Sequence, residues 1–299
     1  MGDFNLASLV GAFAQITVLA VMVSVGLNLN FRELFALWRK PGLLARSYLA
    51  VVILVPLVTL AVILIFNLPP AVNIALMLMA VAPGAPLATK RVVGAGGDVP
   101  YAASLQVTVN LFAIVTIPLF LYVLSTLFEP EAHVRSGVIA RQVATVQFAP
   151  LVFGILLATT WPRFSHRFGE IITKVSNVML VVLVGVVGLA GWRAFLDAFR
   201  GMGWLSFVAA AIIIGVSLTL GHLLGGPEKE KRTTLAVMCI VRNLGLVVFL
   251  VMRDFPGQGL LGVLVAYVII GLVVQTVYTT LRKHGEKKAA GAEAPAENS

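Results

Sequence analysis

Residues 232–252 read RTTLAVMCIVRNLGLVVFLVM, a stretch that is long and apolar enough to cross a lipid bilayer. Arg242 and Asn243 stand in its middle, and Gly245 follows closely. A charged side chain at the centre of a membrane helix costs about 3 kcal/mol on insertion scales, so the few that occur usually serve a function. The stretch therefore predicts a membrane helix that carries a functional interruption at Arg242.

The composition of the whole chain is typical of an integral membrane protein. Of its 299 residues, 59% are hydrophobic and only 12% are charged, whereas soluble domains carry about 25% charged residues. Long apolar runs recur from end to end, which is typical of a polytopic helical membrane protein. The fold class expected is all-α, with the lipid bilayer as surroundings.

Proline and glycine punctuate the apolar runs and divide them into about nine spans. The predicted spans are 7–29, 43–66, 71–94, 99–127, 137–160, 171–191, 203–224, 233–253 and 258–281. Residues 1–282 then form one transmembrane domain. The polar tail, residues 283–299, is predicted to be a disordered cytoplasmic segment.

The basic residues predict an orientation. With the N-terminus outside, only Arg135, Arg193, Arg200 and Arg253 fall on the outer side. Arg141, Lys174 and Arg242 fall within spans, and the other fifteen of the 22 Lys and Arg residues lie inside. Because cytoplasmic loops collect Lys and Arg, this count predicts an inner-membrane protein with its N-terminus outside and its C-terminus in the cytoplasm.

Several classes of function lack the residues that they need. Cys239 is the single cysteine, and the four histidines form no pair at helical spacing, so neither a disulfide nor a metal centre is predicted. No constellation of catalytic residues lies within the spans, which argues against an enzyme with or without a cofactor. The net charge of +9 comes from short clusters between apolar runs and requires no nucleic-acid partner.

A second interruption lies in the third predicted span, where Pro83-Gly84-Ala85-Pro86 follows an apolar helical start. Proline removes a backbone donor and clashes with the preceding turn, so two prolines around a glycine should unwind the helix. One interrupted span in each half of a chain is a pointer to a transporter's binding site. The alternative is a structural kink packed against neighbouring helices.

Motifs in both halves of the chain are similar to those of one known family. Pro83-Gly84 is similar to its Pro-Gly-Gly break, Gly97-Asp98 to its Gly-Asp/Asn turn, and 242–246 (RNLGL) to its Gln-Asn-Ser-Gly-Leu motif. Pro56 falls on its second-span proline. On these motifs the chain resembles the bile acid:sodium symporter family. The resemblance implies inverted repeats, about 7–127 and 137–282, and a panel domain that moves against a core domain where two broken helices cross.

The side chains that bind sodium in that family are replaced here. The residues at the matching positions are Val51, Ala88, Thr89, Ala102, Gln106, Met238 and Arg242. Sodium requires several oxygen ligands, which apolar side chains and an arginine do not supply. All thirteen Asp and Glu residues lie outside the predicted spans or at their edges, so no mid-membrane carboxylate is available to a cation or a proton. The resemblance thus predicts a divergent member without sodium coupling.

A buried guanidinium needs a partner, and three remain for Arg242. Backbone carbonyls at the end of the first half of the third span would make it a tethered replacement for sodium. An anionic substrate would pair with it directly. The third alternative is a water-filled cavity without a specific role. In the first two cases Asn243, Thr89, Gln106 and the backbone around Pro83 and Gly84 would add hydrogen bonds.

Lys90 is a second candidate for attracting an anion, because it follows Thr89 directly; the competing interpretation is that Lys90 and Arg91 only obey the positive-inside rule. The predicted function is transport of a small organic anion, bile-acid-like or another carboxylate or sulfate, by alternating access. Two alternatives stay open: sodium symport through backbone oxygens, and a membrane sensor that binds a ligand without transport. The sequence gives no indication of an oligomeric state.

Overall fold

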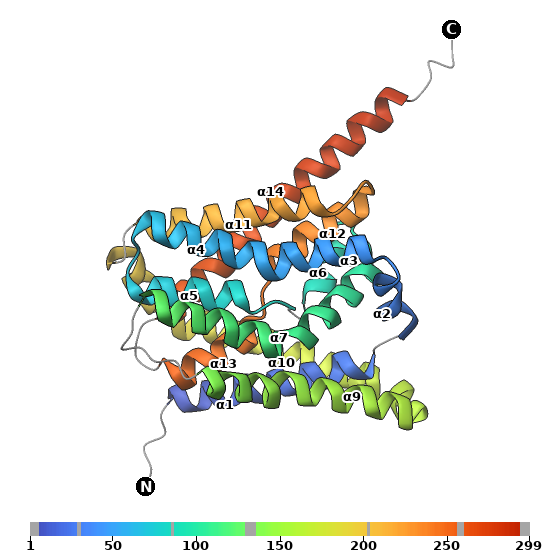
Figure 1. Cartoon of the computed structure of the whole chain (residues 1–299), viewed down its shortest axis with the longest axis horizontal. Helices are drawn as coiled ribbons and strands as arrows, with labels where there is room; N and C mark the ends of the chain where they lie inside the picture. Colours follow the sequence, from blue (N-terminus) through green and yellow to red (C-terminus); the bar gives the residue numbers. More distant parts are fainter. Residues whose placement is uncertain are drawn as a thin grey trace.

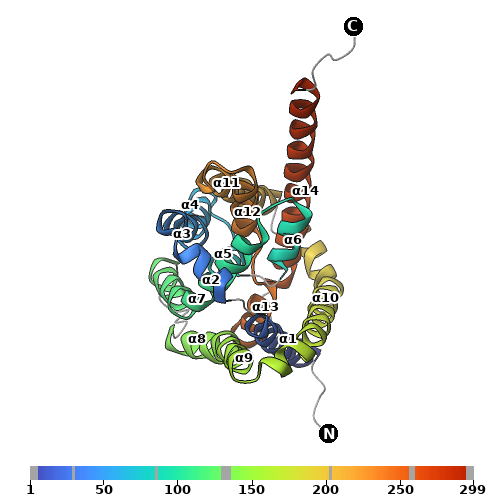
Figure 2. The same ribbon diagram turned by 90° about the vertical axis from the view of Figure 1, so that its right-hand side faces the viewer.

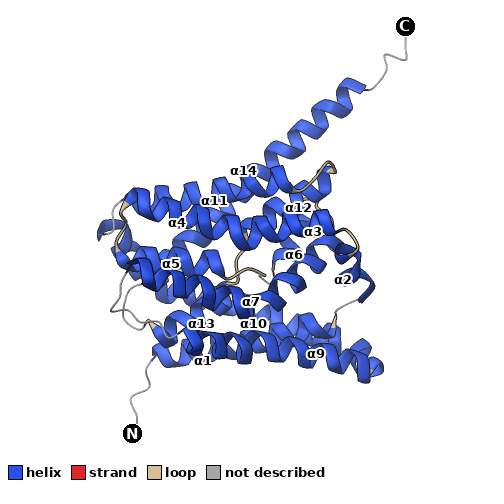
Figure 3. Ribbon diagram, viewed as in Figure 1, coloured by secondary structure: helices blue, strands red, loops and turns tan. Residues whose placement is uncertain are grey.

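Helices make up all the regular secondary structure in the part of the chain that the computed structural model describes, residues 6–28, 31–84, 87–128, 136–201, 204–255 and 260–293 (Figure 3). In chain order they are α1 (Leu6–Leu27), α2 (Phe31–Trp38), α3 (Pro41–Tyr48), η1 (Leu49–Leu54), α4 (Val55–Phe66), α5 (Pro70–Val81), α6 (Ala88–Gly94), α7 (Val99–Phe128), α8 (Ser136–Val143), η2 (Ala144–Phe148), α9 (Ala149–Thr160), α10 (Pro162–Gly201), α11 (Trp204–Leu224), α12 (Lys229–Ile240), α13 (Leu244–Asp254) and α14 (Leu260–Glu293). The all-α class is confirmed.

Seven segments within the described residues are long and apolar enough to cross a membrane. They correspond to the predicted spans except 71–94, which is α5 and α6, and 99–127, which is α7. A polytopic membrane protein is therefore confirmed, and the number nine stays a prediction. The segment Lys229–Asp254 is the most enclosed of the seven, with 94% of its apolar window buried against 44% or less for the others.

The two interrupted spans meet in the middle of the molecule (Figure 1). α5 ends at Val81 and α6 begins at Ala88, while α12 ends at Ile240 and α13 begins at Leu244. The backbone N–H of Asn243 donates a hydrogen bond to the carbonyl of Ala82, with 2.9 Å between nitrogen and oxygen. A backbone N–H left free by one break thus pairs with a carbonyl left free by the other break.

Two spans contain a short π-helical segment, η1 between α3 and α4 and η2 between α8 and α9. Each segment ends two residues before a proline, Pro56 or Pro150. Proline cannot donate a backbone hydrogen bond, and its ring crowds the preceding turn of an α-helix. A wider turn of π-type avoids the clash and leaves the span continuous.

Figure 2 shows the helices in two groups. α1, α8, α9 and α10 lie on one side and form the panel group; the remaining long helices form the core group around α12. Gly26 of α1 and Gly154 of α9 bring two panel helices into backbone contact, because a Cβ on Gly154 would lie 2.4 Å from the carbonyl oxygen of Val23. The division into inverted repeats at 7–127 and 137–282 stays a prediction.

The end of the chain differs from the expected disordered tail. α14 continues past residue 283 to Glu293 and extends away from the bundle (Figure 1). The added residues include Lys287-Lys288-Ala289-Ala290, and both residue types favour helix strongly enough to continue one that has already formed. Residues 294–299 of the predicted tail lie outside the described residues.

Candidate functional site at the helix crossing

Arg242 lies at the crossing and is buried, with 5% of its surface exposed. One terminal nitrogen, Nη2, donates to the carbonyl of Cys239 at 2.7 Å, and the other, Nη1, donates to the carbonyl of Val51 at 3.2 Å. The guanidinium therefore links the end of α12 to η1 in the second span. A positive charge is favourable at the C-terminal end of a half-helix, where the carbonyl dipoles point outward.

Both carbonyls are free for a reason that the sequence contains. In an uninterrupted helix Cys239 would accept from the N–H of Asn243, but that N–H is bonded to Ala82. In η1 the N–H of Val55 donates to the carbonyl of Ala50, five residues earlier, which is the π-helical pattern. In the same pattern the carbonyl of Val51 would accept from the N–H of residue 56. Residue 56 is proline and has no N–H. The guanidinium thus occupies two acceptors that the backbone does not use.

The prediction of which carbonyls bind Arg242 was wrong in one respect. Helix-end carbonyls do bind Arg242, but they belong to α12 itself and to η1 rather than to the end of the first half of the third span. The carbonyl of Ala82, just after α5, is already taken by the N–H of Asn243. The backbone of the crossing therefore satisfies that acceptor before a side chain can reach it.

Asn243 and Gly84 shape the two breaks. Asn243 is the N-cap of α13, where its Oδ1 accepts from the N–H of Leu246 at 3.2 Å. Gly84 has a φ of 79°, and a Cβ at this position would lie 1.9 Å from Oδ1 of Asn110. Only glycine fits both the left-handed backbone and this contact. Pro83, beside it, is buried.

The other predicted site residues divide between this crossing and its surroundings. Thr89 donates from Oγ1 to Oε1 of Gln106 at 3.0 Å, which ties α6 to α7. Met238 is buried inside α12 with 1% exposure. Lys90 is exposed on α6. None of these four residues lines the cavity described next.

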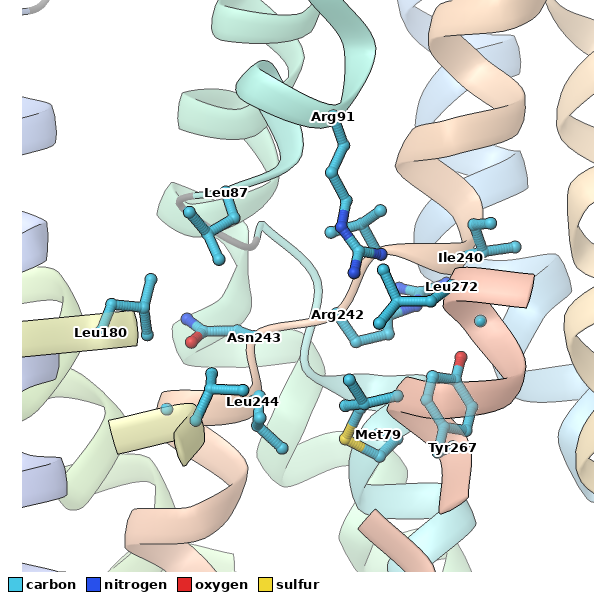
Figure 4. A pocket seen from close by; sticks show the side chains of 15 residues that line it. Met79, Leu87, Arg91, Leu180, Ile240, Arg242, Asn243, Leu244, Tyr267 and Leu272 are labelled. Atoms are coloured by element: carbon cyan, nitrogen blue, oxygen red, sulfur yellow. The ribbon is translucent and has the colours of Figure 1, made fainter. Parts of the chain in front are cut away.

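A cavity of about 130 Å³ adjoins the crossing, between it and helices α10 and α14. Arg242 and Asn243 line it from the break, Leu180 and Val184 from α10, and Tyr267 and Leu272 from α14. Arg91 enters from α6, and its side chain extends toward Arg242 (Figure 4). The cavity therefore lies between the core group and the panel helix α10.

Arg91 and Tyr267 were not predicted as site residues. Arg91 lies four residues after Leu87, another lining residue, so both point to one side of α6, whereas Lys90 is turned away. The four-residue spacing from Leu87 is the sequence signal that places Arg91, and not Lys90, on the cavity side of α6. Tyr267 lies in the middle of an apolar span, and the linear sequence offers no comparable signal for its position.

Comparison with known proteins decides the family. The model of the Sodium Bile acid symporter family matches residues 15–195, more than half of the chain. The chain belongs to this family. Its relatives include sodium-dependent organic anion transporters of Homo sapiens, 22% identical over 90% of this chain and 74% of theirs, and of Mus musculus, 22% identical over 96% and 78%. The ileal sodium/bile acid cotransporter of Oryctolagus cuniculus is 24% identical over 62% of this chain and 54% of its own.

The family and these relatives are transporters, the class to which the two interrupted spans pointed, and the predicted resemblance is confirmed. The chain is accordingly an integral membrane protein of a transporter family. Within the described residues, no group of three or more His, Cys, Asp or Glu side chains is placed to hold a metal ion.

Proposed function

We propose that this protein transports a small organic anion across the membrane by alternating access, without sodium, and that Arg242 takes the place of the bound cation. The cavity lies between the core group and panel helix α10, where rocking of one group against the other would expose it to each side in turn. The relatives' names mention organic anions and bile acids. The basic residues support an inner-membrane location with the N-terminus outside.

The observation that carries this proposal is the pair of hydrogen bonds made by the Arg242 guanidinium. On the motif matches of the sequence, Val51, Met238 and Arg242 correspond to sodium-ligand positions of the family, and the Arg242 guanidinium contacts the backbone of Val51. A sodium ion in the same place would compete with a permanent charge for the same carbonyl oxygens. The built-in cation keeps the site electropositive for an anion without an ion to be carried along.

Sodium symport is the second candidate, because two of the relatives named above are called sodium-dependent. It would require backbone oxygens other than those that Arg242 occupies. Thr89 and Gln106 are the polar side chains that the resemblance places at sodium-ligand positions, and they are hydrogen-bonded to each other. A sensor that binds without transport is the third alternative.

Flux through the full-length protein in proteoliposomes tests the proposal. Labelled taurocholate and labelled butanesulfonate suit the assay, because their permanently ionised head groups hinder uncatalysed passage. We expect counterflow of at least one of them at equal rates in sodium and in choline buffers. Flux that requires sodium would establish the symport alternative, and absence of flux both for these two anions and for labelled isovalerate, relative to protein-free liposomes, would contradict transport.

A further inference from the structure

The cavity at the crossing contains two positive charges and no negative one among its lining residues. Arg91 enters from α6 and Arg242 from the break between α12 and α13, and in Figure 4 the side chain of Arg91 extends toward that break. In a poorly solvated cavity, an anion is attracted by each of these two charges more strongly than it would be in water. Gln275 steadies the first of them, since its Oε1 accepts from Nη1 of Arg91 at 3.3 Å.

Donor groups at this cavity have no partner in the described part of the chain. Nε of Arg242 and Nδ2 of Asn243 are both buried and unbonded there. The Tyr267 hydroxyl lies near the Arg242 guanidinium but makes no hydrogen bond of ordinary geometry. Leaving a buried donor without an acceptor is costly, and native proteins rarely do so without a ligand or water. A ligand with acceptor atoms could bind Nε of Arg242 and Nδ2 of Asn243.

The rest of the lining is apolar and the space is small. Leu180 and Val184 of α10 and Leu272 of α14 face the cavity opposite the break. Its volume is about 130 Å³. Pockets for drug-sized ligands hold roughly 300 to 1,000 Å³. A charged head with a few carbon atoms fits this volume, and a sterol skeleton would extend beyond it.

We propose that the substrate is a small organic monocarboxylate, held by its carboxylate between Arg91 and Arg242, with a short apolar body against Leu180 and Leu272. This inference rests on the proposed transport function and specifies its substrate class. Arg91 supplies a planar, forked donor that matches a carboxylate. Nε of Arg242 and Nδ2 of Asn243 complete the set of donors, and the Tyr267 hydroxyl adds another.

Equilibrium binding to the full-length purified protein tests the inference, with isovalerate as the probe in a sodium-free, low-chloride choline buffer at neutral pH. We expect isovalerate to bind, and isovaleramide, which has the same body without the charge, to bind at least tenfold more weakly. Taurocholate should not compete. These comparisons need no variant, so misfolding of a variant leaves the inference testable.

Substitutions then assign the roles. Arg91→Gln should weaken isovalerate binding by about tenfold or more, and Tyr267→Phe by a smaller factor. Lys90→Gln, which removes a charge one residue away on the exposed side of α6, should change binding less than about twofold, since surface charges are screened. Arg91→Lys keeps the charge but loses the fork and should bind at an intermediate strength.

Three results would overturn the inference: equal binding of isovalerate and its amide, equal effects of Arg91→Gln and Lys90→Gln, or competition by taurocholate. Its failure is separable from failure of transport. Sodium-independent flux of taurocholate together with any of these results would leave the transport proposal standing and remove the small-carboxylate site. Absence of flux for both labelled anions and for labelled isovalerate would remove transport itself.

Discussion

At the scale of single residues, Arg242 holds the crossing together by satisfying two carbonyls that the backbone leaves free. Arg242→Gln removes the charge and cannot bridge both acceptors from the same place, so we expect anion uptake by proteoliposomes to fall at least tenfold. The variant should still fold, because removing a buried charge relieves its desolvation cost. Detergent-solubilised protein with an unchanged elution profile would verify this.

Arg242→Lys is the matched control for charge alone. Its compact ammonium keeps a positive charge but lacks the forked geometry that reaches Val51 and Cys239 together. We expect uptake between that of the wild type and that of Arg242→Gln. Full activity in Arg242→Gln would show that the guanidinium is dispensable and would refute its role as a tethered cation.

At the scale of the elements, the π-helical segment η1 prepares an acceptor for Arg242, because Pro56 cannot donate to Val51. Pro56→Ala restores an N–H at this place, which can compete with the guanidinium for the Val51 carbonyl. We expect Pro56→Ala and Arg242→Gln to be coupled by about 1 kcal/mol or more in a double-mutant cycle of unfolding free energies. Thermal unfolding in detergent measures the four variants of the cycle.

Pro150→Ala provides the comparison at η2. The carbonyl freed there belongs to Thr145, an exposed residue far from the guanidinium in sequence and not bonded to it. This substitution should show additive effects with Arg242→Gln. Additivity for Pro56→Ala as well would mean that η1 does not act through Arg242.

The sequence was sufficient to predict most elements and both breaks, because apolar run length and proline-glycine chemistry act locally. It was also sufficient to place Arg242 at the crossing. The partners of Arg242 depend on hydrogen-bond register, since a proline at 56 frees residue 51 only if the turn is of π-type. The choice between Lys90 and Arg91 depends on the rotation of a two-turn helix after an irregular break. Such contacts are set by tertiary packing, which residue patterns do not report.

At the scale of the whole molecule, alternating access requires α10 of the panel group to move relative to α14 of the core group around the cavity. A reversible cross-link between cysteines introduced at Val184 and Val268, which both line the cavity, should abolish uptake, and reduction should restore it. The native Cys239 is fully buried and should not interfere. Each single-cysteine variant under the same treatment is the control. Undiminished uptake after complete cross-linking would contradict the rocking motion.

Thermal unfolding of the purified wild-type protein in detergent, with sodium chloride exchanged for choline chloride at equal ionic strength, tests most directly whether Arg242 replaces a bound sodium ion. A ligand present at about 100 times its dissociation constant stabilises the folded state by about 2.7 kcal/mol. We predict the same unfolding temperature in both salts, because the guanidinium already occupies the Val51 and Cys239 carbonyls. A higher unfolding temperature specific to sodium would contradict the account and make sodium symport the function.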